Sequence, residues 1–178
     1  MAPASQSAPQ SLTLDTHRDR RNWWQSVWIR RALLALPTAL VILALLNAFG
    51  QRPHASTVAA PEARLTVVAP VHGRSGLIYA ARFQVDAISE LKKATLILAP
   101  GWADGYTVNG QAPQPLTQGS DDGKLDFGFG RVPAGKRLTF WISLQINPTT
   151  VGRHRQDVSL YDGSTLIAAV HRTVTIFP

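Results

Sequence analysis

The sequence predicts an all-β domain, an antiparallel sandwich of seven to eight strands, preceded by one N-terminal transmembrane helix. Three observations lead to this prediction. Residues 32–50 read ALLALPTALVILALLNAFG and contain no charged side chain. After residue 62, apolar residues alternate with polar ones in several short runs, the pattern of strands that bury one face. Turn-forming residues separate these runs, and none of the runs has a convincing helical period.

Residues 1–31 are too few and too polar to bury a core, and we expect them to form a disordered, basic, cytoplasmic tail. Toward the end of this tail, tryptophans stand beside arginines directly before the apolar segment. Amphipathic rings and cations in this position are typical of the lipid headgroup layer. We therefore expect these residues at the membrane interface: Trp23, Trp24, Trp28, Arg30 and Arg31. The alternative is an aromatic cluster without such a role.

The segment 32–50 is the predicted membrane span. As a helix its residues rise about 28 Å, close to the roughly 30 Å of a bilayer's hydrocarbon core. Five arginines lie within residues 18–31, whereas only Arg52 and Arg64 follow the segment closely. Because positive charge is retained in the cytoplasm, we expect a single-pass protein of the cell membrane with its N-terminus inside. The C-terminal domain would then be periplasmic or extracellular.

A cleavable signal peptide is the alternative to a retained anchor. The apolar core 32–46 is short enough for a signal, and Ala48-Phe49-Gly50 offers small residues at a cleavage site before Gln51. The stretch ahead of this core is long for a signal peptide, which favours the anchor. Under either hypothesis the C-terminal domain leaves the cytoplasm.

Residues 51–62 are polar and contain proline, so we predict a linker there and place the sandwich at residues 63–178. Short strands separated by turn formers are typical of a β-sandwich, and eight candidate strands alternate in this way. The expected strands are residues 64–69, 77–86, 93–99, 104–109, 124–129, 136–147, 156–161 and 164–177.

Part of the domain carries a recognisable series of turns. Pro133-Ala134-Gly135 leads into a long strand, Asn147-Pro148 and Gly152 form the next turn, and a later strand ends on Tyr161-Asp162-Gly163. In this series residues 131–178 resemble the C-terminal half of bacterial immunoglobulin-like modules, including those related to cell-adhesion-type domains. The resemblance covers about a quarter of the chain. It implies an immunoglobulin-like sandwich with a binding or accessory role, and it brings no catalytic residues.

Composition excludes several classes of function. The chain has no cysteine, which rules out disulfides, thiolate catalysis, thiolate metal sites and a lipid-modified cysteine anchor. An extracytoplasmic domain without cysteine favours a bacterial source. The net charge is +7, and the part before Glu62 carries +4 of it, which suits anionic lipid headgroups. On the domain, Lys92-Lys93 and Lys136-Arg137 are isolated pairs, so we expect no nucleic-acid partner.

No cofactor or metal site is predicted. The five histidines show none of the paired spacings of metal ligands. Asp121, Asp122 and Asp126 gather three carboxylates, but the spacing of a calcium loop is missing, and a solvated hairpin turn explains the same residues. No serine lies in a nucleophile-elbow context, although the members of a catalytic triad meet only in space.

Two tryptophans are the candidate partner contacts. Trp141 lies on the strand whose apolar face carries Phe140 and Ile142, so its ring should point to the opposite, polar face. A large exposed ring in polar surroundings is typical of a contact residue. The alternative is that a loop covers this face or that a bulge shifts the register. Trp102, in a turn-rich segment, is either a second contact or a packing residue.

The sequence therefore predicts a membrane-anchored, extracytoplasmic sandwich that is a non-catalytic binding or accessory module for another component of the cell envelope. The alternative is a secreted or anchored hydrolase whose site is not visible in the sequence. A hydrolase requires a concave pocket with convergent polar groups, whereas a binding module presents strand faces and loops.

The arginine distribution yields a topology prediction. A reporter enzyme that is active only outside the cytoplasm should be active when fused after Pro178. Activity of a cytoplasmic reporter at the same position would contradict the assigned orientation. The mass of the mature protein separates the two hypotheses for the apolar segment, because a chain beginning at Gln51 would identify a signal peptide.

Overall fold

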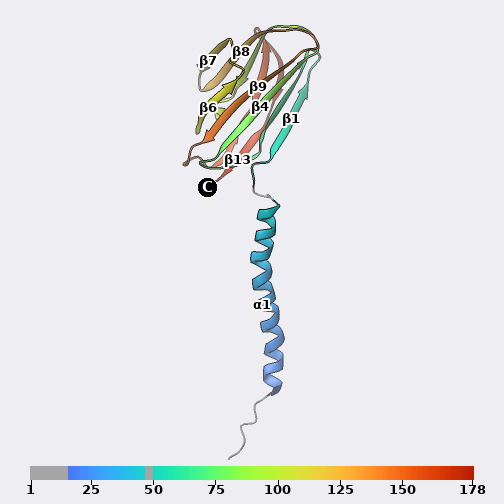
Figure 1. The fold of residues 1–178 in the computed structure, drawn as a ribbon, viewed down its shortest axis with the longest axis vertical. Helices are drawn as coiled ribbons and strands as arrows, with labels where there is room; N and C mark the ends of the chain where they lie inside the picture. Colours follow the sequence, from blue (N-terminus) through green and yellow to red (C-terminus); the bar gives the residue numbers. More distant parts are fainter. Residues whose placement is uncertain (1–15, 47–49) are drawn as a thin grey trace, which may run out of the picture. The chain divides into compact units, whose positions relative to one another are not determined.

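A computed structural model describes residues 16–46 and 50–178, with side chains described from Val27 onward. The chain divides into two compact units, one that contains the single described helix and one that contains all the described strands. The predicted class, an all-β sandwich preceded by one apolar helix, is confirmed (Figure 1).

The helix, α1, spans Thr16–Leu45 and contains one segment, Val27–Leu45, that is long and apolar enough to cross a membrane. By length and composition this segment fits an anchor and a signal sequence equally. The predicted start at Ala32 is wrong, and so is the predicted disorder of residues 16–31. No proline or glycine interrupts residues 16–36, and extending an existing helix adds one hydrogen bond for each residue fixed. Residues 1–15 lie outside the described residues.

The second unit contains thirteen described strands and one short 3₁₀ helix. They are β1 (Pro53–Ala59), β2 (Ala63–Pro70), β3 (His72–Arg74), β4 (Ile78–Ala87), β5 (Leu91–Leu98), η1 (Pro100–Trp102), β6 (Tyr106–Ala112), β7 (Thr117–Asp121), β8 (Lys124–Val132), β9 (Arg137–Ile146), β10 (Gly152–Arg155), β11 (Val158–Asp162), β12 (Thr165–Val170) and β13 (Thr173–Phe177).

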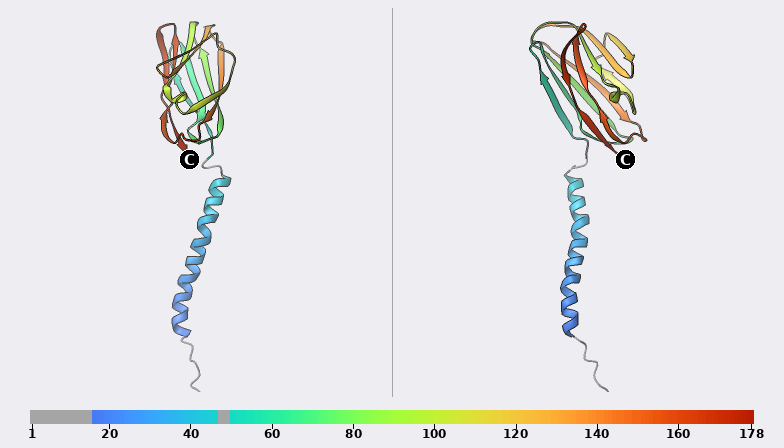
Figure 2. Two further views of the ribbon diagram at one scale, coloured as in Figure 1. Left: turned by 90° about the vertical axis from the view of Figure 1, so that its left-hand side faces the viewer. Right: turned by 180° about the vertical axis from the view of Figure 1, so that it is seen from behind.

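Two five-stranded antiparallel sheets form the layers of the sandwich. One has the order β1-β2-β4-β9-β6 and the other the order β12-β11-β5-β8-β7. A smaller sheet, β10-β13-β3, is completed by a parallel pair, β13 with β3. The two views of Figure 2 show the strands as two layers.

Each of the eight expected strand ranges overlaps a strand, and 164–177 contains two. The predicted linker is wrong in part, because β1 occupies it and pairs along its full length with β2. All but one residue of β1 are exposed, so no buried apolar row announced this edge strand. The short strands β3 and β10 and the fully exposed strand β7 were missed for the same reason.

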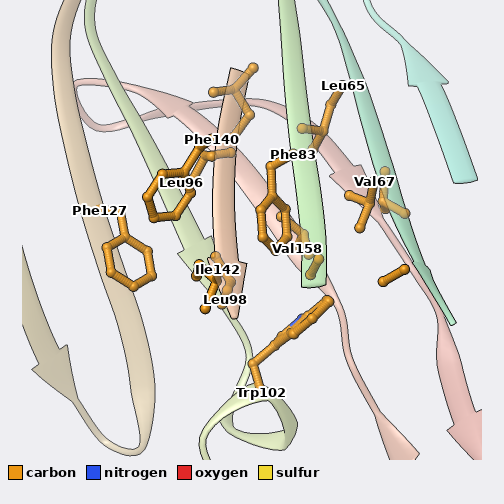
Figure 3. Close-up of a cluster of buried hydrophobic side chains, with 14 of the residues drawn as sticks. Leu65, Val67, Phe83, Leu96, Leu98, Trp102, Phe127, Phe140, Ile142 and Val158 are labelled. Atoms are coloured by element: carbon orange, nitrogen blue, oxygen red, sulfur yellow. The ribbon is translucent and has the colours of Figure 1, made fainter. Parts of the chain in front are cut away.

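The core lies between the two sheets and confirms the predicted alternation. Phe140 on β9 is fully buried, and its ring centroid lies 5.0 Å from that of Phe127 and 4.9 Å from that of Phe129 on the facing sheet. Phe83 on the neighbouring strand β4 lies 6.0 Å away (Figure 3). Aromatic packing across the two layers therefore holds the sandwich together at its centre.

Substitution of Phe140 tests this core. Phe140→Ala removes a fully buried ring that packs against three other phenylalanine rings, and it should lower the free energy of unfolding by about 3–5 kcal/mol. Trp141→Ala, its neighbour on β9, should lower it by less than half of that, because its ring is 43% exposed. Denaturant unfolding of a fragment covering residues 50–178 measures both. Equal losses for the two variants would mean that the Trp141 ring contributes to the core.

Candidate functional site

The candidate site is the outer face of the sheet β1-β2-β4-β9-β6. Because side chains alternate along β9, Trp141 points away from the core that Phe140 fills. Strand register places one residue from each strand in a row across this face. The row is Ala55, Val68, Arg82, Trp141 and Ala112. We call it the tryptophan row.

Trp141 is partly exposed and pairs with a cation. The guanidinium carbon of Arg82 lies 5.1 Å from the centroid of the Trp141 ring, within the range of a cation–π contact. The Nε of Arg82 is buried and has no hydrogen-bond partner. The ring is thus held from one side by its cross-strand neighbour, while the rest of the ring faces solvent.

A shallow hollow of about 290 Å³ lies beside the ring. Its lining is Pro53, Val68, Ala80, Arg82 and Trp141, contributed by four of the five strands. Small side chains next to a large ring leave this space, because they do not reach the height of the indole. The arrangement suits a partner side chain that stacks on the ring, and it holds no group positioned for bond breaking.

Away from the tryptophan row the same face becomes polar. The Thr57 and Thr66 hydroxyls lie 3.0 Å apart across β1 and β2. Farther along, Arg137 forms an ion pair with Asp86 on the neighbouring strand. This face combines one partly exposed ring, small side chains beside it, and hydroxyls and charges at its border. That combination matches the composition of a protein contact surface.

Trp102 is not a surface contact. The short helix η1 places Trp102 between the sheets, where it is fully buried. Its centroid lies 5.3 Å from that of Phe83, and its Nε1 donates to the Asp157 carbonyl at 3.2 Å. Of the two roles that the sequence left open for Trp102, contact and packing, the structure shows packing.

Trp102 belongs to a buried polar cluster that the sequence did not reveal. The Arg172 guanidinium lies 5.3 Å from the Trp102 ring, and its Nη2 donates to the carbonyls of Ala69 and Pro70 at 3.1 and 2.6 Å. Gln156, also buried, donates to the Tyr79 hydroxyl at 3.2 Å. Both residues occupy positions where polar side chains look like ordinary solvent-facing ones, so the pattern carried no signal.

Burial dominates the ionisation of this cluster. It lowers the pKa of Arg172 and raises the pKa of Tyr79 and, more strongly, that of Tyr106. The Tyr106 hydroxyl, the Gln156 carbonyl oxygen and two Arg172 nitrogens are buried without hydrogen-bond partners. The cluster is therefore a structural support for the turn at η1 and offers no accessible group for chemistry.

The acidic residues singled out in the sequence form a turn. Asp122 and Gly123 have φ values of 51° and 75°, the conformation of a two-residue hairpin loop between β7 and β8. Asp121 and Asp126 line a groove of about 300 Å³ together with Lys124 and Asp157. Within the described residues, no three acidic or histidine side chains gather as a group that would hold a metal ion.

The histidines have separate surroundings. His171 Nδ1 lies 3.2 Å from the Asp157 carboxylate. Partial burial alone would raise the pKa of Asp157, but hydrogen bonds from His171, the Arg172 backbone and Arg155 outweigh it and lower that pKa. Ser159 lines the same groove as Asp157, yet no hydrogen bond joins it to His171 in the described part of the chain. A serine triad is therefore not assembled there.

Of the predicted interface residues, the side chains of Trp23 and Trp24 lie outside the described ones. Trp28, Arg30 and Arg31 are exposed on α1. The guanidinium carbon of Arg31 lies 5.7 Å from the centroid of the Trp28 ring. Ring and cation thus lie together at the start of the apolar segment.

No protein-family model and no curated relative matches the sequence. Among solved structures, CaCohA2 from Clostridium acetobutylicum is similar, with 18% identity, a TM-score of 0.43, and coverage of 60% of this chain and 85% of the other. The non-cellulosomal cohesin from the archaeon Archaeoglobus fulgidus has 11% identity, a TM-score of 0.41, and coverage of 71% and 92%. WR4, an MSP family member from C. elegans, has 9% identity, a TM-score of 0.36, and coverage of 64% and 97%. Likeness at this level carries no argument about function.

The buried arginine gives a second stability prediction. Arg172→Met keeps an apolar side chain against Trp102 but leaves the carbonyls of Ala69 and Pro70 without their donor. Each unpaired buried carbonyl costs about 1–3 kcal/mol, so the free energy of unfolding should fall by about 2–6 kcal/mol. Arg155→Met is the matched control, because its side chain is 76% exposed and a surface ion pair contributes about 1 kcal/mol or less. Urea unfolding of residues 50–178 measures both variants. Equal effects would contradict a stabilising role for the Arg172 hydrogen bonds to Ala69 and Pro70.

Proposed function

We propose that this protein is anchored in the cell membrane by α1 and presents its β-sandwich outside the cytoplasm as a non-catalytic binding module for another envelope component. The observation that carries the proposal is the tryptophan row, in which a partly exposed ring lies beside a hollow and a cation. Aromatic residues and arginine are the types that contribute most to protein contacts.

The properties of α1 support the membrane part of the proposal. Its apolar segment Val27–Leu45 is long enough to span a bilayer, and its large apolar side chains are exposed. Three arginines precede this segment, and Arg30 and Arg31 lie near its start, so these charges would remain on the cytoplasmic side. With the helix inserted in this orientation, the sandwich is extracytoplasmic.

The chemistry of the pockets favours binding over hydrolysis. The groove that contains Asp157 and Ser159 pairs its carboxylate with His171 and Arg155, without a nucleophile bonded to the imidazole. The hollow at Trp141 is lined by apolar and cationic groups. A serine hydrolase requires its nucleophile within hydrogen-bond reach of its base, so this arrangement gives no support to that form of the alternative hypothesis.

Co-purification from gently solubilised membranes tests the proposal. A partner captured by the full-length protein should be lost or strongly reduced with Trp141→Ala, because the variant removes the ring on which the partner stacks. Arg82→Ala should weaken capture less, since the ring on which the partner stacks remains. Leu166→Ala is the control, because Leu166 is 52% exposed on the other five-stranded sheet. Capture that survives Trp141→Ala unchanged would place binding elsewhere.

A further inference from the structure

One end of the sandwich is defined by the first residue of β1 and the last residue of β13. Pro53 pairs with Pro70, and β3 follows directly and pairs with β13. Backbone hydrogen bonds close this end: Ser75 N–H donates to the Phe177 carbonyl, and Gly76 N–H donates to the Ile146 carbonyl. We call it the proximal end, because the chain that leaves α1 enters the sandwich there. Figure 2 shows the start of β1 and the C-terminus at this end of the strands.

Large apolar side chains gather at the proximal end without entering the core. Leu77, Ile78, Val151 and Phe177 are each 42–56% exposed. Their backbones are neighbours, since Ile146 N–H donates to Leu77 and the residue after Val151 pairs with Ile176. Exposed large apolar side chains elsewhere in the sandwich come from separate strands and loops: Val58, Ile88, Val108, Leu116, Trp141 and Leu166.

The charge at the proximal end is positive. The segments that meet there are 50–54, 70–79, 104–107, 145–153 and 175–178. Their side chains include three arginines, Arg52, Arg74 and Arg153, but only one carboxylate, that of Asp104. Arg74 and Arg153 are exposed, and the Arg74 Nε donates to the Pro178 oxygen at 3.1 Å. The other eight carboxylates of the sandwich lie outside these segments. Exposed apolar side chains accompanied by arginines fit a lipid surface, which has anionic headgroups above an apolar interior.

The chain between α1 and β1 is short. Seven residues, 46–52, separate Leu45 from Pro53. Even fully extended, this stretch spans about 28 Å. When the helix is inserted, the proximal end therefore cannot leave the vicinity of the bilayer surface. A short tether of this kind gives a second contact an effective concentration on the order of millimolar, so that even a weak affinity for lipid suffices.

We propose that the proximal end docks on the outer lipid surface of the membrane that holds α1, inserting Leu77, Ile78, Val151 and Phe177 between headgroups while Arg74 and Arg153 contact lipid phosphates. This inference rests on the proposed anchoring and adds a second, peripheral membrane contact. It commits to lipid as the occupant, because the tether brings lipid to this end and the charge suits anionic headgroups. A protein partner or a second copy of the chain is an outcome that the test must distinguish.

The absence of cysteine allows a direct test with single labels on the full chain. Ile78→Cys and Phe177→Cys report on the proximal end. Leu166→Cys is the matched control, because Leu166 is similarly exposed but lies on β12, at the end of the sandwich away from the proximal end. Each variant carries an environment-sensitive dye and is reconstituted into phosphatidylcholine liposomes with and without phosphatidylglycerol. A spin-labelled lipid should quench the dyes at 78 and 177 several-fold more than the dye at 166. Removing phosphatidylglycerol, or adding Arg74→Glu and Arg153→Glu, should reduce this difference.

The outcomes separate docking from anchoring. Protein that comigrates with liposomes but shows equal, weak lipid quenching at all three positions retains its anchor and contradicts docking. Protein that fails to comigrate contradicts the anchor and the docking together. Dyes at 78 and 177 that are shielded from a water-soluble quencher, yet not reached by the lipid quencher, would mean that protein covers this end and would overturn the inference. Strong lipid quenching that ignores both charge changes would remove the role assigned to the arginines.

Discussion

The contact between Arg172 and Trp102 is the constraint on which the part of the sandwich around η1 and the proximal end depends. Strand β12 belongs to one five-stranded sheet and β13 to the small sheet, and the chain changes sheets at His171 and Arg172. The Arg172 guanidinium is inserted between the layers, where it stacks on Trp102 and binds two carbonyls at the end of β2. One side chain thus joins the crossover, the turn at η1 and the strand that leads into β3. The position of the proximal end follows from that junction.

The backbone of β9 links the core to the proposed binding face in a similar way. Phe140 and Trp141 are consecutive, and the pleat sends the first into the aromatic cluster and the second to solvent. Because Phe140 is fixed by rings from both sheets, the backbone beneath Trp141 has little freedom to move. A rigid ring loses little conformational entropy when a partner stacks on it, so a rigid core contributes to affinity at the surface.

Sequence reasoning recovered those parts of the fold in which burial alternates with apolar type. It located Phe83, Phe140 and their strands because buried positions there are apolar and exposed ones polar. It merged β12 with β13 because no glycine or proline separates them in the sequence, although the pairing partners change.

Where burial and polarity disagree, the pattern was silent. Exposed β1 and β7 carry no apolar row, while Gln156 and Arg172 are polar yet buried. The outward direction of Trp141 followed from the period of its strand, whereas the burial of Trp102 depends on how η1 folds between two sheets. Periodicity is a property of single strands. Positions that depend on contacts between distant segments are therefore beyond its reach.

A membrane contact at the proximal end would also change what the tryptophan row can do. Without that contact, the seven connecting residues would be the attachment of the sandwich to the inserted helix, and a partner in the same membrane would have to remove the rotational freedom of the sandwich when it binds. Fixing the proximal end on lipid removes most of this freedom beforehand, so the free-energy cost falls outside the binding step. Pro53 is the first residue of β1 and also lines the hollow beside Trp141. The two surfaces therefore meet at one strand, and orienting one of them on the bilayer orients the other toward whatever lies alongside.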